Sequence, residues 1–262
     1  MGSSQHVIAQ LGRPNPTFTV LFLTPAGIYA RLVMEELQAE LERRASPEKK
    51  AWWENYVKGA SFRGTPMSEV RSAVVGWLDA HPELSTRQTK RLAVDLMRQP
   101  LTEDKLAGIL ILAEHLIDQL GIEDLPGFRA LLAEEHLGDW SSCDWFCVKV
   151  LGQMLVRSGE RERIADEIIE WSRSGDLWVR RAGMVAFVNL APKGDAALPG
   201  LTERLLIGAQ RNARDERRFA QTSVGWVLRE LSITEPEAVR RFLAEHGDRL
   251  SSEARRAAAA KL

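Results

Sequence analysis

Residues 85–116 read STRQTKRLAVDLMRQPLTEDKLAGILILAEHL, with leucines at helical spacing on both sides of Pro100. The recurring positions are Leu92, Leu96, Leu106, Leu110 and Leu116. Side chains three or four residues apart share one face of an α-helix, whereas a half-buried strand needs strict alternation. Ser85 and Thr102 are candidate N-caps, because a hydroxyl there satisfies an N–H group of the first turn. We therefore predict two amphipathic helices joined by a short break at the proline.

The same pattern continues along the rest of the chain. Segments of roughly 10 to 20 residues with helical apolar spacing alternate with brief Gly, Pro, Ser, Asp or Asn breaks. No Asn-Gly or Asp-Gly hairpin dipeptide occurs, so strand signals are nearly absent. Helix pairs recur about every 35 to 45 residues, the length of HEAT-like repeats. The predicted fold is all-α, a curved superhelical stack of HEAT-like antiparallel helix pairs (an α-solenoid) whose concave face binds the ligand.

The ends of the chain differ in their patterning. Residues 1–25 carry several glycines and prolines in a weakly patterned stretch, so we expect an N-terminal extension with little regular structure. Residues 26–262 are expected to form a single elongated domain, because a repeat stack grows without the size limit of one compact core.

Composition limits the classes of function. The chain has 45% hydrophobic and 27% charged residues, and no uncharged apolar run reaches the roughly 20 residues that span a bilayer. We therefore expect a soluble, cytoplasmic protein without a membrane partner. Cys143 and Cys147 lie four apart on one helical face, which suits neither a disulfide nor a tetrahedral metal site, so we interpret both as small buried side chains.

The net charge of −1 does not indicate a nucleic-acid-binding protein. However, residues 161–262 hold 18 Lys and Arg against 15 Asp and Glu, while residues 1–160 hold 17 against 21. The basic excess is therefore C-terminal, and phosphate binding would need a local stripe of basic side chains.

Three tryptophan-containing segments stand out among the eight tryptophans of the chain. They read DWSSCDWF (139–146), DLWVRRA (176–182) and QTSVGWVLRE (221–230). Trp140 and Asp144 lie four apart, and Trp178 and Arg181 lie three apart, so each pair shares a helical face. Among the tryptophans outside these segments, we interpret Trp52, Trp53 and Trp77 as repeat core.

In this order and spacing, the three segments resemble the signature of the AlkD-like DNA alkylation repair family, the HEAT-like-repeat alkylpurine DNA glycosylases. A looser similarity covers the Gly64-Thr65-Pro66 turn, which precedes a helix with Arg71, and Tyr56 stands near the position of a family aromatic. The resemblance spans roughly residues 46–262. It implies a monofunctional hydrolase that removes 3-methyladenine- or 7-methylguanine-type purines from double-stranded DNA, gripping the backbone without a base-specific pocket. It implies no cofactor and no metal, and we expect a monomer.

The chemistry of these side chains suits such a reaction. A purine alkylated at N3 or N7 is cationic, and its departure builds positive charge on the deoxyribose. Asp144 is the candidate catalytic carboxylate, because a fixed anion stabilises that charge and can orient the attacking water. Trp140 and Trp226 are the other catalytic candidates, since an indole face attracts a developing cation.

The candidate DNA-binding residues surround these positions. Arg181 presents a planar fork of donors that can hold a phosphate bidentately. The remaining candidates are Trp178, Tyr56, Arg180, Lys149 and Arg218. If DNA binds, Arg211, Arg214 and Arg217 should converge with the basic members of this set on the concave face.

Two structural alternatives stay open. Trp178 also suits a helical core, and Asp144 also suits a buried ion pair with Arg181. On those alternatives the chain is a non-catalytic helical-repeat module that binds a DNA structure or serves as a protein scaffold.

Overall fold

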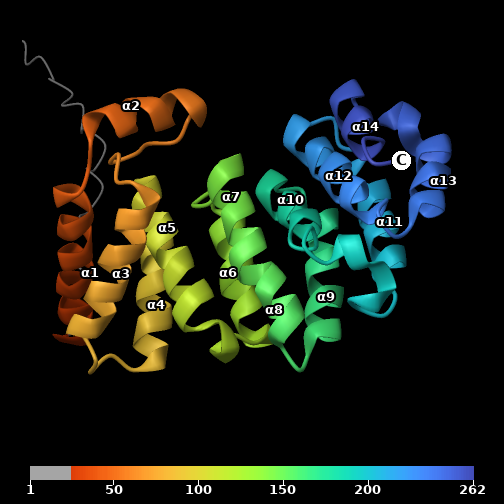
Figure 1. Ribbon diagram of the computed structural model, residues 1–262. Coiled ribbons are helices and arrows are strands. Elements are labelled where there is room, and N and C mark those ends of the chain that lie inside the picture. The colour runs from red at the N-terminus through yellow and green to blue at the C-terminus, as the bar shows by residue number, and fades with distance from the viewer. Residues whose placement is uncertain (1–24) are drawn as a thin grey trace, which may run out of the picture.

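The computed structural model describes residues 25–262, and these form a curved stack of helices (Figure 1). The first seven α-helices are α1 (Pro25–Arg43), α2 (Pro47–Tyr56), α3 (Met67–Ala80), α4 (Thr86–Met97), α5 (Thr102–Leu110), α6 (Leu125–Ala133) and α7 (Trp140–Phe146). The next seven are α8 (Gly152–Arg157), α9 (Arg161–Glu170), α10 (Leu177–Val185), α11 (Leu201–Asn212), α12 (Arg218–Leu231), α13 (Pro236–His246) and α14 (Ser252–Ala258).

Short helical segments of other types join or extend these helices. Two are π-helical, η1 (Ile111–His115) after α5 and η4 (Cys147–Leu151) between α7 and α8. The 3₁₀ segments are η2 (Ile117–Gln119), η3 (Ile122–Asp124), η5 (Trp171–Arg173), η6 (Ala191–Ala196) and η7 (Gly247–Arg249). Within residues 25–262 there is no β-strand, only an isolated bridge between Ser61 and Leu101. The predicted all-α solenoid is confirmed.

The local signals at residues 85–116 are confirmed in part. Ser85 caps α4 in a reciprocal capping box with Gln88, and Leu92 and Leu96 are buried in that helix. The prediction that Thr102 caps the next helix is wrong, because Leu101 occupies the cap position. The hydroxyl of Thr102 instead donates to the carbonyl oxygen of Ser61 at 3.0 Å, so a contact distant in sequence outweighs the local one.

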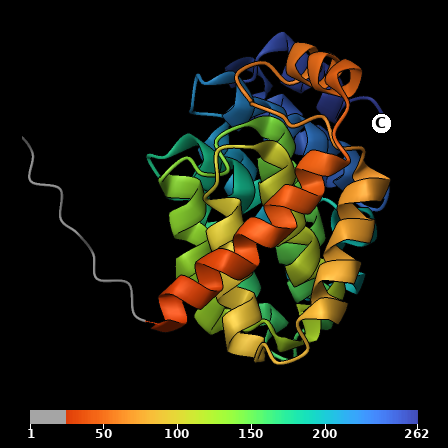
Figure 2. The same ribbon diagram turned by 90° about the vertical axis from the view of Figure 1, so that its left-hand side faces the viewer.

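One row of helices gives the stack its direction. Along it α1 packs on α3, then α5, α7, α10, α12 and α14 follow, each against the one before. Figure 2, seen from the α1 end, shows α1 crossing obliquely over the helices behind it and α2 lying above them. One cluster of buried apolar side chains runs from Val33 to Ala258, so the core is continuous along the row.

Two glycines allow helices of the stack to approach closely. A Cβ atom on Gly108 of α5 would lie 2.3 Å from the carbonyl oxygen of Ala93 in α4, and one on Gly225 of α12 would lie 2.7 Å from that of Ala254 in α14. Both distances are shorter than any real Cβ contact, so these crossings require glycine.

The upper edge of the stack is lower in its middle than at its ends. In Figure 1, α2 at one end and α14 at the other rise above α7 and α10.

The predicted N-terminal extension includes Pro25, but the structure makes Pro25 the first residue of α1. Residues 1–24 of the predicted extension lie outside the described part. No helix of the described residues is long and apolar enough to cross a membrane.

Candidate functional site

An ion pair joins α7 to α10 at the centre of the row. Asp139 caps α7 by accepting from the backbone N–H groups of Ser141 and Ser142 at 2.8 and 2.9 Å. One turn further on, Asp144 receives Nε of Arg181 on one carboxylate oxygen and Nη2 on the other, both at 2.7 Å. This fork-to-fork geometry is the strongest form of an arginine–carboxylate contact.

Water is largely excluded from this pair. The side chain of Asp144 is 14% exposed and that of Arg181 is 5% exposed. Burial raises the pKa of Asp144 above its ordinary value, and the guanidinium of Arg181 only partly offsets this. Each carboxylate oxygen receives one N–H, which leaves further acceptor capacity on both. A new positive charge near Asp144 would restore stabilisation that burial has removed.

Arg181 also binds α12, the next helix of the row. Its Nη1 donates to the carbonyl oxygen of Phe219 at 2.8 Å and to Oγ1 of Thr222 at 3.1 Å. Four of the five N–H donors of the guanidinium are therefore used within the protein. One donor remains, so the bidentate grip of Arg181 on a phosphate, which stays a prediction, would require the guanidinium to release one of these partners.

Trp226 lies one helical turn beyond Thr222, so it shares that face of α12. Its side chain is partly buried and packs against the core. Phe219 and Thr222 are site residues that we did not predict. Both follow Arg218 in the first turns of α12, yet only the fold shows that they face Arg181.

Trp140 connects the Asp144–Arg181 ion pair to the N-terminal part of the stack. It is the first residue of α7, partly buried, and its ring lies 5.6 Å from the ring of Tyr56 in an edge-to-face contact. Tyr56 in turn stacks on Trp52. The interpretation of Trp52 as core is wrong, because its side chain is 55% exposed, whereas Trp77 is buried as predicted.

Trp178 belongs to the core. It is only 7% exposed, and its ring lies 5.3 Å from that of Phe219 on α12. This burial agrees with the alternative that Trp178 suits a helical core, and its contact with DNA stays a prediction. The two cysteines of α7 and η4, Cys143 and Cys147, are free and buried, as predicted.

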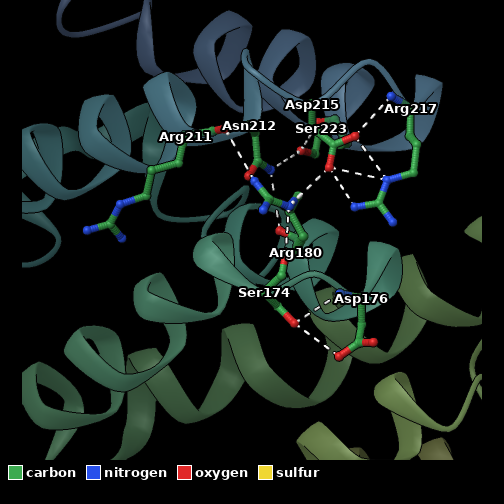
Figure 3. A network of polar contacts seen from close by, with 9 residues as sticks. Ser174, Asp176, Arg180, Arg211, Asn212, Asp215, Arg217 and Ser223 are labelled. Atoms are coloured by element: carbon green, nitrogen blue, oxygen red, sulfur yellow. Dashed lines mark hydrogen bonds and ion pairs between the residues drawn. The ribbon is translucent and has the colours of Figure 1, made fainter.

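Five arginines gather around one hollow beside this site. It has a volume of about 570 Å³ and is lined by Arg173, Arg180, Arg211, Arg214 and Arg217 together with Asp215 and Glu216. Figure 3 shows Arg180 at the centre of the polar network in this region. Its Nε donates to the carbonyl oxygen of Ser174 at 2.8 Å and lies 3.1 Å from the carboxylate of Asp215.

The charges of this arginine hollow are partly compensated. Asp215 also pairs with Arg217 at 2.6 Å, and the hydrogen bond from Arg217 lowers the pKa of Asp215. Arg211 pairs with Glu170 at 3.0 Å. Glu170 also pairs with Arg173 at 2.8 Å. Even with Glu170 counted beside the two acids of the lining, the five arginines remain in excess, which favours binding of an anion.

The remaining basic candidates stand apart from the hollow. Arg218 pairs with Glu253, and its guanidinium lies 5.3 Å from the ring of Phe219, whose ring centre is 5.8 Å from the guanidinium of Arg181. Lys149 is exposed and lies 5.6 Å from the ring of Trp145. The structure thus brings together four of the seven predicted basic residues and places the others separately. Among residues 25–262, no three histidine, cysteine or carboxylate side chains cluster as a metal site would require.

Comparisons with known proteins agree with this architecture. Residues 37–262 match the model of a protein family described as DNA alkylation repair enzyme. Among solved structures the chain is similar to a predicted DNA alkylation repair enzyme from Enterococcus faecalis, with a TM-score of 0.70 and 20% sequence identity. That alignment covers 84% of this chain and 97% of the other, and at this identity it shows a shared fold. A search of curated proteins gives no match.

Proposed function

The chain belongs to the DNA alkylation repair enzyme family, and from that premise we propose that it is a DNA glycosylase that hydrolyses the N-glycosidic bond of cationic alkylated purines in duplex DNA. Family membership supports the role in DNA repair and DNA as the partner. The observation that carries the proposed reaction is the carboxylate of Asp144, which is only 14% exposed, is fixed by Arg181 and lies one turn from Trp140.

Asp144 acts on the sugar in this mechanism. A purine methylated at N3 or N7 leaves as a neutral base, and the positive charge passes to the deoxyribose. A desolvated, preorganised carboxylate stabilises that charge more than water does, because it needs no reorganisation when the charge appears. The same carboxylate can accept a proton from the attacking water. Trp140 and Trp226 supply indole faces toward the cation.

Arg181 positions Asp144 in this proposal. Four donors of Arg181 are committed to Asp144, Phe219 and Thr222. Arg181 therefore fixes the carboxylate of Asp144, on α7, relative to α10 and α12. The arginine hollow supplies the phosphate contacts instead, and Arg180 connects the two sites because it is adjacent to Arg181 on α10. Selectivity then comes from the lability of the cationic glycosidic bond, without a base-specific pocket.

Release of base from modified DNA tests the proposal. Duplexes carrying 7-methylguanine or 3-methyladenine are incubated with the protein, and the free base is quantified against the spontaneous rate. We expect release well above that rate from modified duplexes and none from unmodified ones. Release at the spontaneous rate would refute the glycosylase assignment.

A second candidate function has one observation in its favour. Both oxygens of Asp144 accept a hydrogen bond from Arg181, as in an ion pair that only holds two helices together. The protein would then be a non-catalytic DNA-structure-binding or scaffold module, which binds modified duplexes without releasing base.

We expect a monomer that acts in the cytoplasm. Size-exclusion chromatography tests the oligomeric state.

A further inference from the structure

Two aromatic side chains on α2 stand out from the rest of the surface. Trp52 and Tyr56 are 55% and 57% exposed, and their rings stack with centroids 5.3 Å apart and planes 18° apart. We call this pair the α2 stack. No residue of the ten-residue helix α2 is buried, so most of the surface of these two rings is not used to pack α2 against the other helices. Exposing large apolar rings in neighbouring positions points to a binding role.

The α2 stack is held in a fixed position. Behind it, Trp53 stacks on the buried ring of Phe62 at 5.7 Å. The segment that carries α2 is closed at its base, because the N–H of Ser46 donates to the carbonyl oxygen of Gly64 at 3.1 Å. Gly64 takes the left-handed conformation this closure needs, with φ of +97°. The rings are therefore presented by an anchored segment, which reduces the entropy lost on binding.

Buried Glu103 reinforces the base of this segment. Its carboxylate accepts from the backbone N–H groups of Arg63, Gly64 and Thr65 at 2.8, 2.8 and 3.1 Å. Glu103 belongs to α5, in the row of helices that carries the site. The α2 segment is thus tied to the same row as Asp144.

The α2 stack continues into the candidate site. The ring of Tyr56 contacts that of Trp140, which lies one turn before Asp144 on α7. We propose that the α2 stack is a platform on which the unpaired base opposite the lesion stacks, while the sugar of the damaged nucleotide lies at Trp140 and Asp144. This rests on the proposed function, which brings a damaged base pair to that point.

The chemistry of α2 favours a nucleobase as the occupant. Lys49, Trp52 and Tyr56 follow three- and four-residue spacing, so a cation shares the helix face with the rings. A base with its phosphate needs this combination, since the π-face meets an aromatic ring and the phosphate meets a cation. Stacking on aromatic rings tolerates any base, because every base has a π-face. A platform of this kind is compatible with lesion recognition that does not read base edges.

The test uses a duplex that cannot react. The probe is a duplex with a tetrahydrofuran abasic-site analogue opposite 2-aminopurine, whose fluorescence falls when it stacks on an aromatic ring. Wild-type protein should bind this probe more tightly than the fully paired duplex and quench its emission. Trp52→Leu, which keeps an apolar side chain but removes the ring, should weaken probe binding about 5- to 150-fold, the range for loss of one stacked base. It should also abolish the additional quenching.

Matched variants complete the experiment. Trp52→Phe should recover most of the affinity, and Ile233→Ser, at an apolar side chain that is also about half exposed, should change nothing. Because Trp52 is not buried, all variants should keep the wild-type thermal midpoint. Unchanged probe binding by Trp52→Leu would overturn the proposal and favour a protein partner for the rings. An equal loss on the paired duplex would also overturn it, since this would show a general DNA contact.

These outcomes are independent of catalysis, because the probe holds no alkylated purine and its abasic-site analogue has no glycosidic bond. Trp52-dependent stacking without base release from methylated duplexes would remove the glycosylase assignment and leave the platform. Base release with normal probe binding by Trp52→Leu would remove the platform alone.

Discussion

Replacing Asp144 by asparagine separates chemistry from architecture at the site. The substitution keeps the shape of the side chain and one acceptor oxygen, but it removes the negative charge and turns the second acceptor into a donor that faces Arg181. If Asp144 stabilises a cationic sugar, excision should fall about 100- to 1000-fold, as for loss of one preorganised electrostatic partner. Affinity for duplex DNA should hold or rise, because an anion near the phosphates is removed.

The structure also predicts a cost in stability for Asp144→Asn. Removing one partner of a buried ion pair destabilises a protein by about 3 to 5 kcal/mol, since it leaves an uncompensated charge. Arg181 keeps its bonds to Phe219 and Thr222, so we expect the lower end, about 3 kcal/mol. For a chain of this length that corresponds to a fall in the thermal midpoint of roughly 6 to 12 °C.

A double variant decides between the two roles. In Asp144→Asn with Arg181→Met both charges are gone, so much of the lost stability should return, whereas excision should stay low. Single-turnover excision is measured on both variants at a temperature where each is folded, and the thermal midpoint of each is measured separately.

As a control, Asp166→Asn removes another aspartate that pairs with an arginine at 2.8 Å but is 63% exposed. It should cost less than about 1 kcal/mol and leave excision unchanged. Normal excision by Asp144→Asn, or its recovery together with stability in the double variant, would contradict the catalytic role.

Four further predictions follow from described contacts. Burial raises the pKa of Asp144, and the carboxylate is the active form. Single-turnover excision should therefore fall as pH falls, with a midpoint above the pKa of an ordinary aspartate. Asp144→Asn should show no such fall at low pH. Gly108→Ala should lower the free energy of unfolding by about 1 to 3 kcal/mol through overpacking against α4. Gly76→Ala in α3, where no atom lies within 4 Å of the new Cβ, should raise that free energy by about 0.5 to 1 kcal/mol. Denaturant titration measures both. Glu103→Ala should cost about 1 to 3 kcal/mol for each buried N–H left unpaired, and hydrogen exchange should rise first in residues 46–65. Combined replacement of Arg214 and Arg217 by alanine should weaken binding to all duplexes alike and flatten the log–log salt dependence by about 0.9 per lost phosphate contact; a loss restricted to certain sequences would disagree with backbone binding by the hollow.

The helical part of the fold was predictable because its signals are local. Leucine spacing and the hydroxyl of Ser85 act within one or two turns, and the structure places a helix with a capping box there. The pairing of Asp144 with Arg181 was one of two predicted alternatives for these residues. Choosing between them required the crossing of α7 and α10, which depends on the whole stack.

Burial was the property that the sequence predicted least well. Trp178 and Trp52 both have apolar neighbours in the sequence and charged residues within one turn, yet Phe219 of α12 packs against the first, while α2, which contains no buried residue, leaves the second exposed. Glu103 gave no signal, since an acidic residue in the first turn of a helix usually serves the helix dipole. Its backbone partners lie about 40 residues earlier in the chain.

A single guanidinium, that of Arg181 on α10, bonds both neighbouring helices of the row, α7 and α12. In a stack where each unit touches only its neighbours, flexing spreads over many compliant joints. Here the hydrogen bonds of Arg181 restrain two of these contacts, the one between α7 and α10 and the one between α10 and α12. The local curvature then depends on the length of one side chain. A duplex lying across α7, α10 and α12 therefore meets a rigid template, and the elastic energy of any misfit is stored in the DNA. Weakly stacked, damaged steps deform at the lowest cost, so stiffness in this span would favour damaged DNA before any side chain touches the lesion.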